Sequence, residues 1–185
     1  MNNFEERITS IRGIPLEHIQ SILKIDPSSP SGLMWTPRDL HHNQKDNCGC
    51  VSIGEKDGYR RFTVTITYNK KKHTITCSQI IFLLANGFLT EGKYIDHIDC
   101  NSLNNKIKNL REVTVSQNCQ NSRISKNNKS GYKGIHWHKS GKKWLIKIRL
   151  KRKLYYFGLY ENLEEAIQVC IAARAKLHGE FGRDK

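Results

Sequence analysis

The sequence has no apolar segment long enough to be a membrane-spanning helix. Such a helix needs roughly 20 consecutive apolar residues, and no stretch of the 185 residues approaches that length. The first residues, Met1 to Arg7, also lack the apolar core of a secretory signal. We therefore expect an intracellular protein, in the cytoplasm or nucleoid of a host cell, with no membrane partner.

Acidic residues are scarce compared with basic ones, 17 against 31, which gives a formal net charge of +14. The excess is uneven, because residues 126–185 carry 15 Lys and Arg against 5 Asp and Glu, whereas residues 1–125 carry 16 against 12. A basic final third indicates a polyanionic partner, usually nucleic acid. The alternative is a solvated basic surface that only keeps the protein soluble.

The six cysteines do not show the spacing of a zinc site. Cys48 and Cys50 form a Cys-x-Cys pair, but no Cys-x-x-Cys or His partner lies at zinc-finger spacing. In an intracellular protein the thiols are expected to be reduced. No structural zinc is predicted.

The hydropathy pattern predicts an α+β protein with a β-rich N-terminal region, residues 1–73. Residues Arg60 to Tyr68 alternate between apolar and threonine side chains, which is typical of a strand with one buried face. The segment from Ser78 to Ala85 is a short apolar helix followed by Asn86-Gly87, a helix-ending pair. The other predicted elements are a helix at 15–24, a turn at 69–72 and a strand at 73–77.

The central region, residues 74–125, predicts two strands joined by an irregular loop and followed by a helix. The expected bounds are strands at 94–98 and 110–113, a loop at 100–108 and a helix at 116–124. In this region Asp96 stands directly beside His97, with Asn109 and Asn118 downstream. A hard divalent cation prefers oxygen ligands such as carboxylates and amides, and an imidazole can take a proton from water near neutral pH.

The C-terminal region, residues 126–185, predicts a basic linker, three strands and a helix. The strands are expected at 134–137, 144–150 and 154–160, with Trp137 and Trp144 as core residues. Asn162 is a candidate N-cap with Glu165 completing a capping box, and Gly179 ends the helix. The helix covers one face of the sheet, so the opposite, polar and basic face is expected to bind nucleic acid.

Residues 74–123 resemble the HNH endonucleases, in particular the intron-encoded and phage homing branch. The matching motifs are Asp96-His97-Ile98-Asp99, Asn101, Leu103-Asn104-Asn105-Lys106-Ile107, Asn109-Leu110 and Ser116-Gln117-Asn118. Relatives commonly carry a His-Arg pair where this chain has Ser78-Gln79. The resemblance implies a ββα-metal module in which His97 is the general base and Asn109 orients its ring. It also implies that Asp96 and Asn118 bind Mg²⁺ or Mn²⁺.

Residues 130–181 resemble the APETALA-two, or ethylene-response-factor, DNA-binding domain. The resemblance lies in Ser130-Gly131-Tyr132-Lys133-Gly134-Ile135, Phe157-Gly158-Leu159-Tyr160 and Leu177-His178-Gly179-Glu180-Phe181, among other positions. It implies that the sheet enters the major groove of double-stranded DNA. Strand parity independently places Lys147 and Arg149 on the exposed face. The DNA-facing residues implied are His136, His138, Lys147, Arg149 and Tyr156, with phosphate contacts from Lys142, Lys143, Lys151 and Arg152.

Together these patterns predict a metal-dependent DNA endonuclease of the HNH homing type, whose C-terminal domain largely chooses the site. One metal centre in a monomeric chain suits a single-strand nick. Two alternatives remain open at this level: a DNA-binding regulator with a silent HNH module, and a restriction or defence nuclease of the same chemistry.

Overall fold

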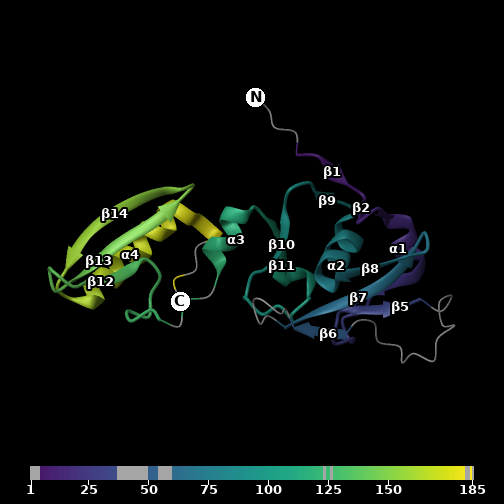
Figure 1. Ribbon diagram of the computed structural model, residues 1–185, viewed down its shortest axis with the longest axis horizontal. Helices are drawn as coiled ribbons and strands as arrows, with labels where there is room; N and C mark the ends of the chain where they lie inside the picture. The colour runs from purple at the N-terminus through teal and green to yellow at the C-terminus, as the bar shows by residue number, and fades with distance from the viewer. Residues whose placement is uncertain are drawn as a thin grey trace. The chain divides into compact units, whose positions relative to one another are not determined.

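The computed structural model in Figure 1 describes residues 5–36, 50–53, 60–122, 124–125, 127–181 and 184. The chain divides into two compact units, Met1–Val113 and Thr114–Lys185. Both contain helices and antiparallel strand pairs, so the predicted α+β class is confirmed. The division falls between the second strand and the helix of the predicted nuclease module, and each unit is described by itself below.

The first unit is built from short strands around one central helix, α2. Its strands pair as β1–β9, β2–β3, β4–β5, β6–β7–β8 and β10–β11, all antiparallel. The elements are β1 (Arg7–Ile8), β2 (Ser10–Ile11), β3 (Ile14–Pro15), α1 (Leu16–Ile22), β4 (Leu23–Ile25), β5 (Leu33–Trp35), β6 (Cys50–Ile53), β7 (Arg60–Tyr68), β8 (Lys71–Thr76), α2 (Cys77–Asn86), β9 (Leu89–Thr90), β10 (Tyr94–His97), η2 (Ile107–Asn109) and β11 (Leu110–Val113).

The hairpin β7–β8 confirms the alternation read from the sequence. Val64 and Ile66 are buried while Thr65 between them is exposed. The turn is shorter than predicted, because Tyr68 already pairs with Lys71. Asn69 and Lys70 alone make it, both with positive φ (49° and 62°), the conformation of the two-residue turns that match the twist of a hairpin.

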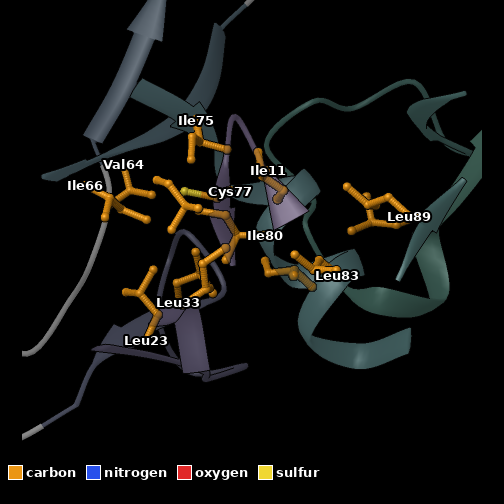
Figure 2. Packing of buried hydrophobic residues seen from close by; sticks show 14 residues of the cluster. Ile11, Leu23, Leu33, Val64, Ile66, Ile75, Cys77, Ile80, Leu83 and Leu89 are labelled. Atoms are coloured by element: carbon orange, nitrogen blue, oxygen red, sulfur yellow. The ribbon is translucent and has the colours of Figure 1, made fainter. Parts of the chain in front are cut away.

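Helix α2 carries the centre of the core, as Figure 2 shows. Its Ile80 is fully buried in a cluster that joins residues before the helix, such as Leu23 of β4, to residues after it, such as Leu110 of β11. Burial of one such side chain stabilises a fold by about 1.5–3 kcal/mol. The N-terminal strands therefore belong to the same core as the nuclease hairpin. The helix ends as predicted, at Gly87 with φ of 79°.

The second unit is a three-stranded antiparallel sheet, β12–β13–β14, packed on helix α4. Its core contains Ile146 and Ile148 of the middle strand together with Ala166 and Cys170 of α4, which confirms the predicted covered face. The elements are α3 (Val115–Asn121), β12 (Ile135–His138), β13 (Lys143–Leu150), β14 (Lys153–Tyr160), α4 (Leu163–His178) and η3 (Gly179–Phe181).

Three details of this unit differ from the sequence-based expectation. Helix α3 ends at Asn121, earlier than the predicted residue 124. Trp137 is 45% exposed and meets Trp144 edge to face, with ring centroids 4.9 Å apart, so the prediction that Trp137 is a core residue is wrong. Asn162 does cap α4, but its side chain accepts from the N–H of Glu164 at 2.7 Å and not from that of Glu165.

A capping box occurs instead at α3. Its N-cap Thr114 accepts from the backbone N–H of Gln117, and the Gln117 side chain accepts from the backbone N–H of Thr114 at 2.8 Å. This reciprocal pair satisfies two of the backbone donors that a helix start leaves open. A seven-residue helix has little intrinsic stability, so this cap helps to hold the turn that carries Asn118.

Candidate functional site

The Asp96–His97 pair lies at the end of β10, in the hairpin β10–β11. In the strand register Asp96 is opposite Arg111 and His97 is opposite Leu110. Successive side chains of a strand point to opposite faces. Asp96 is accordingly buried, with 8% exposed, while His97 is half-buried. The hairpin therefore presents the carboxylate and the imidazole on different faces.

Asn105 holds the His97 ring. Its Oδ1 lies 3.0 Å from Nε2 of His97, and its Nδ2 donates to the carbonyl of Ser31 at 2.9 Å. A carbonyl can only accept, so the amide group must turn its NH₂ to Ser31 and its oxygen to His97. Nε2 of His97 is then the protonated nitrogen, and the neutral ring has its lone pair on Nδ1.

No role for Asn105 was predicted from the sequence, although it is only 6% exposed. Its sequence signal is its place in the motif Leu103-Asn104-Asn105-Lys106-Ile107, in the loop after β10. The residue that completes its geometry, Ser31, is 74 positions away. Only the packed structure brings that carbonyl to the nuclease loop.

Asn109, the predicted orienting residue, organises the loop that follows β10. Its Nδ2 donates to Asp99 Oδ1 at 3.0 Å and to the carbonyl of Asn104 at 2.8 Å. Its Oδ1 accepts from the backbone N–H of Asp99 at 3.1 Å, and its own carbonyl accepts from Ile98 at 2.9 Å. Asn109 thus ties both ends of this loop together, while Asn105 meets the imidazole.

Asp99 is the acceptor at the centre of this loop. Its carboxylate receives hydrogen bonds from the Asn104 side chain at 2.7 Å, from the backbone of Asn101 at 2.8 Å and from Asn109. Burial opposes ionisation, but these donors outweigh it, so the pKa of Asp99 lies below its ordinary value. The carboxylate shapes the loop beside His97.

Asp96 forms an ion pair with Arg111 across the hairpin. Nε of Arg111 lies 3.1 Å from Oδ2 of Asp96, and the two side chains are 17% and 8% exposed. A buried carboxylate is costly without a partner, so Arg111 keeps the ionised form acceptable in this position. This contact was not predicted from the sequence, because it depends on the register of β10 and β11.

The predicted metal ligands are suited to a hard cation by donor type. Asp96 offers a carboxylate and Asn118 an amide oxygen, the donors that Mg²⁺ and Mn²⁺ take in proteins. Asn118 lies on α3, in the second unit. Within the described residues, no group of three or more His, Cys, Asp or Glu is arranged to hold a metal ion. Cys48 lies outside the described residues, and Cys50 is described by its backbone alone, in β6.

A cavity of about 280 Å³ opens beside His97. The Ser78-Gln79 pair lies in its wall. Arg61 contributes positive charge there, and the exposed ring of Tyr94 contributes an aromatic surface. Neither residue was predicted as part of the site. The full lining consists of Arg61, Thr76, Ser78, Gln79, Tyr94, Ile95, His97 and Ser102.

The second unit places the predicted DNA-facing strand residues on one side of its sheet. In β13, Lys147 and Arg149 alternate with the buried Ile146 and Ile148, and Lys147 is opposite Tyr156. Tyr156 is 66% exposed. His136 lies on the same face, and burial together with the neighbouring Lys147 lowers its pKa. A neutral histidine beside a lysine leaves the positive charge of this face on Lys147 and Arg149.

The predicted turn residues have more varied surroundings. His138 Nδ1 accepts from the backbone of Gly141 at 3.1 Å, so this ring supports the turn after β12. Lys143 pairs with Glu161 at 3.1 Å on the surface. Lys151 and Arg152 form the two-residue turn between β13 and β14, both with positive φ, and both are exposed, as is Lys142.

No helix within the described part of the chain is long and apolar enough to cross a membrane. This finding agrees with the absence of a long apolar run in the sequence.

Comparisons with known proteins agree with this geometry. Residues 77–120 match the family model described as HNH endonuclease, which covers α2, the β10–β11 hairpin and most of α3. Over 99 residues the chain is 37% identical to Protein 3.8 of Escherichia phage T7, a match that spans 54% of this chain and 81% of the phage protein. No solved structure matches the chain. The chain therefore belongs to the family of phage T7 Protein 3.8 and carries an HNH endonuclease module, whose substrate is a nucleic acid.

Proposed function

We propose that this protein is a metal-dependent endonuclease that hydrolyses phosphodiester bonds of double-stranded DNA, leaving single-strand nicks. The observation that carries the proposal is the oriented His97 imidazole at the wall of a cavity inside the HNH module. A base held in one tautomer, next to a space for substrate, is the arrangement that general-base catalysis requires.

His97 is proposed as the base that takes a proton from the attacking water at Nδ1. Asn105 supports this assignment because its oxygen faces Nε2 and so keeps the proton there. Partners of this kind fix the direction of the ring as well as its tautomer. Arg61, in the same cavity wall, is proposed to contact the phosphate that is being attacked.

Asp96 and Asn118 are proposed as the residues that hold one Mg²⁺ or Mn²⁺ ion. Such an ion supplies stabilisation of the charge that develops on the phosphate and the leaving oxygen. Before it binds, Arg111 balances the charge of Asp96. Asn109 and Asp99 contribute by holding the loop after β10 in one shape.

We further propose that residues 126–185 form an ethylene-response-factor-type domain that binds DNA through the exposed face of its sheet and largely chooses the cleavage site. Support comes from the sheet, which has one covered face and one face bearing Lys147, Arg149 and Tyr156. One catalytic centre in a chain that acts as a monomer suits a nick in a single strand.

The test is a nicking assay on supercoiled plasmid with Mg²⁺, with Mn²⁺ and with EDTA. We expect metal-dependent conversion to the open circle, and loss of that conversion in His97→Ala. His73→Ala is a matched control, because His73 is a half-buried histidine on β8 outside the nuclease hairpin. Nicking that persists in His97→Ala would refute the role of His97. DNA binding without any metal-dependent nicking would favour the regulator with a silent module.

A further inference from the structure

The sheet of the second unit has a partly open edge. β12 pairs with β13 only from Lys143 to Ile146. Beyond that point the backbone N–H of Lys147 donates to Gly134 at 2.8 Å, and the rest of β13 has β14 on its other side. His178 of α4 reaches the open edge, where its Nε2 bonds to the carbonyl of Arg149 at 3.2 Å.

A groove of about 920 Å³ lies along this edge, with helix α3 as part of its wall. Four residues of α3, two from each of its two turns, line the groove. One side of the short helix therefore faces the groove. Among the described residues, the lining contains six lysines and arginines and no carboxylate. The full lining is Val115, Ser116, Cys119, Gln120, Lys133, Gly134, His136, Lys147, Ile148, Arg149, Lys151, Arg152, Arg174 and His178.

Two of the six cations have structural partners. Lys133 donates to the carbonyl of Gln120 at 3.1 Å and to that of Ser122, which ties the end of α3 to the groove. Arg174 pairs with Asp184 at 2.9 Å.

The other four cations are Lys147, Arg149, Lys151 and Arg152, and no ion pair links them to a carboxylate within the described chain. A concave surface with this many like charges attracts a polyanion and concentrates it.

The four cations follow one line instead of converging on one point. Lys147 and Arg149 are two residues apart on β13, about 6.6 Å by the rise of a strand. This spacing is close to the rise of two nucleotide steps along the axis of a duplex, about 6.8 Å. Lys151 and Arg152 continue the line at the turn. A row of this kind fits several phosphates spaced along one strand better than a single free phosphate.

We infer that the groove between the edge of β13 and helix α3 holds the sugar–phosphate backbone of one strand of the bound DNA. This inference rests on the proposed function and deepens it. The contact surface extends from the sheet face onto the helix that carries Asn118, the proposed metal ligand. DNA bound by the C-terminal domain then contacts the same short helix that carries the proposed metal ligand Asn118.

Cys119 provides a reporter inside the groove, because its thiol is exposed while that of Cys170 is buried. N-ethylmaleimide should alkylate Cys119 in the free protein, and peptide mass spectrometry measures how fast this alkylation proceeds. A saturating DNA duplex should slow this reaction about tenfold, whereas millimolar inorganic phosphate should not. Unchanged alkylation at DNA saturation would overturn the inference. Equal protection by inorganic phosphate would replace it with a site for a free phosphate.

A second experiment removes charge without disturbing the hairpin. Lys151→Asn with Arg152→Gly introduces the residue pair that two-residue hairpin turns prefer, so the fold should be kept. Loss of two phosphate contacts should reduce the slope of log affinity against log salt by about 1.8. Lys176→Gln, an exposed lysine of α4 outside the groove, is the control and should leave the slope nearly unchanged. An unchanged slope in the double variant would also overturn the inference.

The His97→Ala variant separates this inference from the proposed nuclease activity. It should abolish nicking and retain the protection of Cys119 by DNA. Protection in a protein that never nicks would support the groove and refute the nuclease. Nicking by the unmodified protein without protection of Cys119 would support the nuclease and refute the groove as the site of the DNA backbone.

Discussion

Replacement of Asn105 by alanine tests the arrangement around His97 most directly. The change removes the acceptor for Nε2 of His97 and the donor to the carbonyl of Ser31, at 3.0 and 2.9 Å. Loss of a partner that orients a catalytic histidine costs about 10–100-fold in activity, or about 1.4–2.8 kcal/mol in the barrier. Ser31 is 1% exposed, and loss of a hydrogen bond to such a buried group should lower stability by about 1–3 kcal/mol.

The assay is single-turnover nicking at saturating DNA, so that the rate reports the chemical step. Affinity for DNA, from fluorescence anisotropy, should be unchanged, because Asn105 is buried beside the imidazole and is not among the residues proposed to contact DNA. The thermal midpoint should fall by several degrees. A rate equal to that of the unmodified protein, with a lower thermal midpoint, would show that Asn105 is structural only and would refute the tautomer argument.

Asn104→Ala is the matched control for this variant. Asn104 stands in the same loop, but its side chain donates to Asp99 at 2.7 Å and not to His97. We expect a much smaller loss of rate for Asn104→Ala than for Asn105→Ala. Equal losses would indicate that the loop as a whole, and not the hydrogen bond to the ring, determines the rate.

Three further predictions concern buried or hydrogen-bonded ionisable groups. Arg111→Met leaves the buried carboxylate of Asp96 without this partner. We expect a loss of about 3–5 kcal/mol in unfolding free energy, measured by urea denaturation. Asp96→Asn in the same background should recover part of the loss, and no recovery would argue against the ion pair. The pKa of Asp99 is lower in the folded protein than its ordinary value of 3.8. The ionised side chain therefore stabilises the fold at pH values above 3.8, and this stabilisation is lost as the pH falls through the folded-state pKa. Asp99→Asn should therefore destabilise the protein at pH 7 and less so near pH 2, and an equal effect at both values would contradict the assignment. Burial raises the pKa of Cys170 to about 11, so iodoacetamide at pH 8 should spare this thiol in the folded protein, and labelling at the rate of an exposed cysteine would contradict its position in the core.

Local patterns in the sequence were sufficient for the elements and for the main motif. Alternation along β7 and β13 depends on the period of a strand, and the end of α2 depends on the left-handed conformation that Gly87 adopts. The spacing of His97, Asn109 and Asn118 is likewise a property of the chain alone. These features could be predicted because each is decided within a few residues or by fixed separations along the chain.

The exposure of Trp137 could not be predicted in this way. Its strand parity matches that of the core residue Ile135, but Trp137 is 45% exposed and lies edge to face against Trp144. Parity indicates only which face of the sheet a side chain lies on. Whether other residues cover that position depends on the packed structure.

The chemistry of the residues was therefore determined by the sequence alone: a carboxylate, an imidazole and two asparagines at fixed spacing, followed by a basic sheet. The tertiary structure decided which groups meet. It brought Ser31 to Asn105, so that Asn105 and not Asn109 faces the His97 ring, and it set Arg111 against Asp96. Contacts of this kind join residues far apart in the chain or in neighbouring strands, and they exist only once the core around α2 has fixed the register and position of each segment.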